Sequence, residues 1–145
     1  PGGTHKHPYC VTLPAALGDP PEIFHQTGCL SDEDMILLHE YDGSIEDPQS
    51  GADLAAAIGN ARVAVLVNHG VIVTGESLEL AVYRAASFER QCRLAYDVLL
   101  ADRSPRIVEK AARPGMQQTL IDRAADIYWS GAVRQLLARS PEVIH

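Results

Sequence analysis

Two aliphatic runs separated by a polar tripeptide constrain the fold of this chain more than any other part of its sequence. Residues 63–67 and 71–73 are continuous runs of Val, Ile, Leu and Ala, and such runs predict strands, the first one buried on both faces. Asn68, His69 and Gly70 lie between them. Polar groups there are costly unless they find partners, and a glycine permits a close backbone approach. We therefore expect His69 at the end of a rigid strand, either as a hydrogen-bonded turn residue or as a functional side chain.

Length and composition are those of an ordinary globular domain. The 145 residues suffice for one domain with its own core. The formal net charge of −7 argues against a nucleic-acid partner. No run approaches the roughly 20 apolar residues of a membrane span, and no signal-peptide pattern is present. We expect a cytoplasmic protein that binds neither nucleic acid nor membrane.

The cysteines give no sign of a disulfide framework. Cys10, Cys29 and Cys92 are odd in number and far apart, and no two of them form a Cys-x-x-Cys pair. This usage is typical of a reducing compartment, so we expect all three to be structural.

Helices and further strands are predicted on both sides of the central stretch. We expect helices over residues 9–17, 51–58, 78–101 and 115–139, a strand over residues 35–41 and a loop over residues 42–50. The first helix should bend near Pro14 and end at Gly18. The last should be kinked at Ser130 and Gly131. No internal repeat is present, which favours a single α/β unit.

The longest predicted helix carries an apolar stripe that should pack against the sheet or a partner helix. Ser77 is its expected N-cap. The stripe follows alternating steps of three and four residues: Leu78, Ala81, Ala85, Phe88, Cys92, Ala95 and Leu99. Five charged residues lie off the stripe and are predicted to be solvated: Glu79, Arg84, Glu89, Arg93 and Asp97.

His5 and His7 form a His-x-His pair near the start of the chain. In an extended segment, side chains two residues apart point to the same side, so the two imidazoles could bind one ion such as Zn²⁺. A His-x-His pair alone is not specific, and a frayed terminus is the alternative. His69 from a distant strand end would complete three histidines with an open position, which is the form of a catalytic zinc site.

These motifs resemble those of the class II aldolase/adducin family. In that family a His-x-His-Pro or His-x-His-Ser motif precedes a helix, and a strand later runs into Asn-His-Gly. A second strand, a glycine and a long helix follow. Residues 5–8, residues 68–70, Gly75 and the helix from Leu78 match this order and spacing.

The resemblance implies the fold and the assembly. The family fold is a three-layer α/β/α unit with a mostly antiparallel central sheet, and members are often homotetramers. The chain matches only about the C-terminal half of a family member. Residues 1–145 are therefore expected to be the C-terminal portion of such a domain, seen as a fragment whose N-terminal portion is absent.

The resemblance also implies the chemistry. Zinc, or another divalent metal, would be bound by His5, His7 and His69. Substrates in the family are small hydroxy-carbonyl compounds or sugar phosphates of carbohydrate metabolism. The leading expectation is a metal-dependent lyase that breaks a carbon–carbon bond through a metal-stabilised enediolate. An epimerase, a dehydratase or a decarboxylase of the same family is the alternative.

Two departures from the family pattern limit these expectations. The glutamate that acts as acid and base in the family lies upstream of His-x-His, and neither Glu22 nor Glu40 is at the matching position, so no catalytic acid or base is assigned here. Residues 1–4 are Pro-Gly-Gly-Thr, where the family has an apolar strand. A non-catalytic, adducin-like assembly module and an α/β domain with unrelated histidines are the other interpretations.

Overall fold

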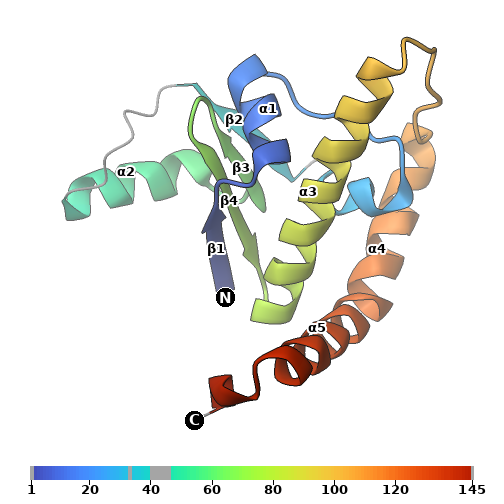
Figure 1. Ribbon diagram of the computed structural model, residues 1–145. Helices are drawn as coiled ribbons and strands as arrows, with labels where there is room; N and C mark the ends of the chain where they lie inside the picture. The colour runs from blue at the N-terminus through green and yellow to red at the C-terminus, as the bar shows by residue number, and fades with distance from the viewer. Residues whose placement is uncertain (1, 33, 40–46, 145) are drawn as a thin grey trace.

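A four-stranded sheet forms the centre of the computed structural model, which describes residues 2–32, 34–39 and 47–144 (Figure 1). The strands are β1 Gly2–Lys6, β2 Met35–Leu38, β3 Val63–Leu66 and β4 Gly70–Gly75, in the spatial order β1-β4-β3-β2. Strand β4 pairs antiparallel with β1 and β3, whereas β2 pairs parallel with β3. The α/β class is confirmed, but the sheet is mixed rather than mostly antiparallel. The reason is that β2 and β3 are joined through a helix, and such a crossover connects parallel strands.

The helices are α1 Tyr9–Leu17, α2 Pro48–Ile58, α3 Leu78–Leu100, α4 Arg113–Arg123 and α5 Ala125–Arg139, with 3₁₀ turns η1 Gln26–Ser31, η2 Lys110–Ala112 and η3 Pro141–Ile144. Helices α1 and α3 pack on this sheet, and α4 and α5 pack on η1 and α3, respectively. In Figure 1, α1 and α3 lie on one side of the sheet and α2 on the other. None of the helices in the described ranges is both long and apolar enough to cross a bilayer.

The core lies between the sheet and helices α1 and α3. Val63 and Val65 of β3, with their β4 partners Val73 and Val71, pack in one cluster with Phe88 of α3. The other two residues of β3, which point to the opposite face, are buried as well. The prediction of a strand buried on both faces is therefore confirmed.

The boundaries of the short elements differ from the prediction in understandable ways. Helix α1 contains Pro14 and ends at Gly18, whose φ of 68° is left-handed, as expected. Helix α2 begins at Pro48, three residues earlier than predicted. Asp47 caps it by accepting hydrogen bonds from two backbone N–H groups, and proline suits the first helical turn. The strand predicted to reach residue 41 ends at Leu38, and residues 40–46 lie outside the described residues.

The predicted cap of helix α3 is confirmed, and of the five charged residues predicted to be solvated only Arg84 is buried. The Ser77 hydroxyl accepts a hydrogen bond from the Leu80 N–H. The middle of the apolar stripe is buried, and its two ends, Leu78 and Leu99, are exposed. Arg84 was predicted to be solvated and is 1% exposed. It is buried because α3 packs both on the sheet and on η1, so a side chain off the main stripe also faces protein.

The predicted C-terminal helix is two helices. The chain breaks at Ala124, between α4 and α5, and not at Ser130 and Gly131, which lie inside α5. The break lies where the chain passes from α4, which packs on η1, to α5, which packs on α3. Leu120 and Ala125, on either side of it, are buried in one cluster with Tyr83 of α3. A glycine in a helix is tolerated at a modest cost, so Gly131 alone does not produce a kink.

Candidate metal centre

The three candidate histidines meet at one edge of the sheet because of how β1 pairs with β4. The register is antiparallel, with His5 opposite Ile72 and Lys6 opposite Val71. The end of β1 therefore lies beside the start of β4, and the turn that carries His69 directly precedes that start. A pairing between residues more than sixty positions apart brings His5 and His7 to His69.

The turn that carries His69 is fixed by backbone hydrogen bonds. The N–H of His69 donates to the carbonyl of Leu66 at 3.0 Å, and the N–H of Asn68 donates to the carbonyl of Ala15 at 3.0 Å. Asn68 has a φ of 60°, in the left-handed region that asparagine adopts more readily than most residues. The chain thus reverses tightly between β3 and β4, with His69 on a constrained backbone.

Helix α1 connects the two parts of the site. It begins directly after His7 and Pro8, and the carbonyl of Pro8 accepts hydrogen bonds from the N–H groups of Val11 and Thr12. Near its other end, Ala15 holds the turn of Asn68. Because Val11 and Ala15 are buried in the core, this helix is a rigid link between the histidine pair and the third histidine.

The three imidazoles lie close enough to share one ion. Ring centroids are separated by 4.6 Å for His5 and His7, 5.1 Å for His5 and His69, and 4.7 Å for His7 and His69. One ring nitrogen from each lies within 4.8 Å of those of the others. His5 and His7 are exposed and His69 is half-buried, so the cluster is open on one side.

The surroundings of His5 favour the neutral form of its ring. Burial, and then repulsion from His7 and His69, lowers the pKa of His5 from its usual 6.5. A neutral imidazole is the form that binds a metal ion.

The residues present fit a divalent metal of the zinc type. Within the described ranges, the cluster consists of these histidines alone. Imidazole nitrogens suit zinc and its neighbours in the first transition row, and three protein ligands with an open position are typical of a catalytic site. Since zinc–nitrogen bonds are about 2.0–2.1 Å long, the rings would move inward to hold such an ion.

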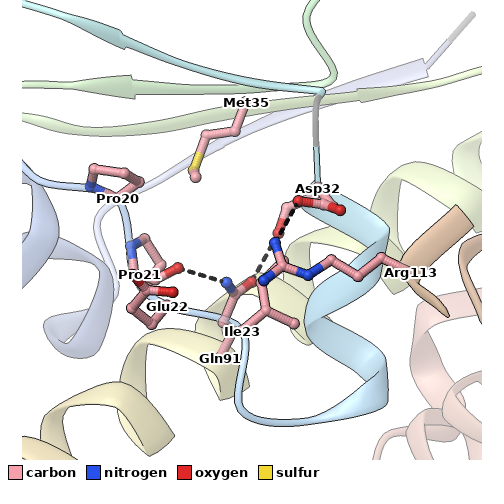
Figure 2. A pocket seen from close by; sticks show the side chains of 9 residues that line it. Pro20, Pro21, Glu22, Ile23, Asp32, Met35, Gln91 and Arg113 are labelled. Atoms are coloured by element: carbon pink, nitrogen blue, oxygen red, sulfur yellow. Dashed lines mark hydrogen bonds and ion pairs between the residues drawn. The ribbon is translucent and has the colours of Figure 1, made fainter. Parts of the chain in front are cut away.

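A separate pocket lies between η1, α3 and α4, and sequence reasoning missed it. It has a volume of about 190 Å³, and none of the three histidines lines it. Figure 2 shows Arg113 paired with Asp32, at 3.1 Å, and Gln91 donating to the Pro21 carbonyl, at 2.9 Å. Glu22 lines this pocket and not the histidine cluster. No sequence signal marks the pocket, because its residues come from distant segments.

Known proteins resemble this chain in sequence and in fold. The family described as "Class II Aldolase and Adducin N-terminal domain" matches residues 3–96. A Schizosaccharomyces pombe protein, the meiotically up-regulated gene 14 protein, is 24% identical over 106 residues, which cover 73% of this chain and 40% of that protein.

Two solved structures illustrate the similarity in fold. An aldolase II superfamily protein from Pseudomonas syringae has a TM-score of 0.78 and 18% identity, covering 95% of this chain and 57% of that one. The L-fuculose 1-phosphate aldolase from Glaciozyma antarctica has a TM-score of 0.73 and 20% identity, covering 94% and 53%. The chain thus spans little more than half the length of these structures. Since the family match covers well over half of the sequence and the fold agrees, the chain belongs to the class II aldolase and adducin family.

Proposed function

We propose that this chain carries the metal centre of a class II aldolase-type lyase that acts on a small hydroxy-carbonyl or sugar-phosphate substrate. The observation that carries the proposal is the convergence of His5, His7 and His69 within 4.8 Å of one another. Family membership and the similarity to a fuculose-phosphate aldolase fold support it. Residues 1–145 would then be the C-terminal portion of the catalytic domain, in a cytoplasmic homotetramer.

The three histidines and the turn between β3 and β4 have defined roles in that proposal. His5 and His7 would hold the ion from the edge strand, and His69 would hold it from the turn between β3 and β4. When bound, the ion would supply a Lewis acid that polarises a substrate oxygen and so lowers the barrier to carbon–carbon cleavage. The backbone bonds at Asn68 and His69 would keep the third ligand in place without reorganisation. The exposed side of the cluster is where substrate would enter.

Proton transfer requires a group that the cluster does not contain. Its ligands are histidines alone within the described ranges, and Glu22 lines the separate pocket. Glu40 lies outside the described residues. The acid or base is therefore proposed to come from a part of the assembled enzyme outside this cluster.

Metal content tests the proposal directly. We expect the purified protein to retain about one equivalent of zinc or another divalent metal after gel filtration, and His69→Ala to lose it. His39→Ala is the matched control, because His39 is an exposed histidine outside the cluster. Equal metal in the parent and in His69→Ala would contradict the proposal. Metal-free parent protein would favour the adducin-like assembly module.

Activity then separates the reactions of the family. For a full-length preparation, we expect metal-dependent cleavage of a hydroxy-carbonyl compound or of a sugar phosphate, abolished by His69→Ala and kept by His39→Ala. Epimerisation, dehydration or decarboxylation of the same compounds without cleavage would assign one of the alternative reactions.

A further inference from the structure

Gly70 lies where β1 and β4 approach each other beside the histidines. A Cβ atom at this position would lie 2.6 Å from the carbonyl oxygen of Lys6 and 2.7 Å from Cδ2 of His7. Favourable contacts of this kind are about 3.5–4.0 Å long. Neither neighbour could stay where it is if residue 70 had a side chain.

The two neighbours differ in how easily they can move. Lys6 belongs to β1 and is held in register opposite Val71 of β4. His7 follows the strand and its side chain is exposed. An added methyl group would therefore rotate the His7 ring away or shift the end of β1, and either change moves the His7 nitrogens. His69 lies on a turn held by its own backbone bonds and would move less.

We propose that Gly70 is a positioning residue of the metal centre: the missing side chain leaves the space in which the His7 ring meets His5 and His69. The inference rests on the proposed metal binding. The His7 ring centroid is 4.6 Å from that of His5 and 4.7 Å from that of His69. Because zinc–nitrogen bonds are only about 2.0–2.1 Å long, a His7 ring held away from the other two rings would no longer reach a shared ion.

Gly75 offers a matched control at the other end of β4. A Cβ atom there would lie 2.7 Å from the backbone nitrogen of Ala81 and 3.0 Å from the carbonyl oxygen of Ser77. Gly75→Ala therefore strains the same strand against backbone to a similar degree. It does so about 17 Å from Gly70, given the rise of about 3.4 Å per residue in a strand.

Metal binding provides the first test. Zn²⁺ affinity would be measured by competition with a chromophoric chelator, and ligand number by the absorption spectrum of the Co²⁺ form. We expect Gly70→Ala to weaken Zn²⁺ binding by about 10–100-fold and to change the Co²⁺ spectrum, while Gly75→Ala changes affinity by less than about threefold. Adding His7→Ala to Gly70→Ala should cost little more affinity, because the ring is already displaced. Adding His7→Ala to Gly75→Ala should lower the Zn²⁺ affinity by the same factor as His7→Ala does in the parent protein.

Stability without metal provides the second test. If the added methyl group meets the His7 ring, His7→Ala should restore part of the stability that Gly70→Ala loses, and none of the stability that Gly75→Ala loses. This comparison needs no bound ion, and the double variant remains measurable if Gly70→Ala alone folds poorly.

The outcomes distinguish the two proposals. A parent protein that binds Zn²⁺ no better than His69→Ala refutes the proposed metal centre, and with it the role of Gly70. If the parent binds Zn²⁺ and Gly70→Ala binds it equally well, only the inference about Gly70 fails. Additive stability effects of Gly70→Ala and His7→Ala would also overturn it.

Discussion

Arg84 is a buried arginine whose removal should be among the most destabilising changes in α3. Its Nη1 donates to the carbonyl of Thr74 at 2.6 Å, and its Nε donates to the carbonyl of Leu30 at 3.3 Å. The carboxylate of Glu76 is 4.0 Å away and mostly exposed. One side chain thus joins the end of β4 and η1 to the long helix.

The size of the effect follows from these contacts. Arg84→Met keeps most of the apolar stem and removes both donors, and each carbonyl left without a partner costs about 1–3 kcal/mol. Burial also lowers the pKa of Arg84, so removing the charge recovers part of the loss. We expect the free energy of unfolding to fall by about 3 kcal/mol. Glu76 contributes little because exposed ion pairs are weak.

Arg93→Met is the matched control on the same helix. Arg93 is exposed, and its pair with Glu89 spans 3.7 Å, so its loss should change stability by less than about 0.5 kcal/mol. Urea unfolding of the parent and both variants at pH 7, followed by circular dichroism, measures the difference. An Arg84→Met variant as stable as Arg93→Met would refute the claim that the two carbonyl contacts of Arg84 stabilise the fold.

The cysteines and His5 provide two further predictions. Cys29 and Cys92 are buried, burial raises the pKa of each thiol, and Cys10 is only half-buried. We therefore expect a maleimide to modify Cys10 quickly in the folded protein and the other two only after unfolding, as followed by mass spectrometry; equal rates for all three would contradict the packing. The pKa of His5 is lower in the folded than in the unfolded metal-free protein, so protons bind the unfolded state more tightly. Its contribution to stability should be constant above about pH 6.5 and fall as the pH drops below this value, and a His5→Gln variant in urea titrations at several pH values should lack this part of the slope.

The parts of the fold that were predicted correctly are those encoded by local patterns. The aliphatic runs before and after Asn68 specified β3 and β4, and the stripe from Ala81 to Ala95 specified the buried face of α3. The predictions were wrong where contacts between distant segments determine burial or the end of a helix. Arg84 is buried because η1 packs over α3, and the break at Ala124 lets α4 and α5 follow different surfaces. Neither contact leaves a periodic signal in the sequence.

The membership of the histidine cluster was predicted, but the reason for its geometry was not. The order of the motifs, which resembles that of the family, predicted that His5, His7 and His69 would lie at one site. In the structure their imidazoles do lie together. The clearance at Gly70 and the left-handed turn at Asn68 depend on atoms from β1 and α1. The sequence Asn68-His69-Gly70 does not reveal such contacts. A glycine at position 70 is equally compatible with a simple bend of the chain.

The register of β1 shows how the parts of this site depend on one another. Residues 2–6 read Gly-Gly-Thr-His-Lys and have no apolar alternation, so the strand itself does little to select its pairing with β4. A slip by one residue would turn His5 to the opposite face of the sheet. Two features outside the strand oppose such a slip: α1, which follows at once and buries Val11 and Ala15, and the Gly70 position, which accepts the His7 ring. The core contacts of α1 therefore help to set the geometry of the histidine cluster.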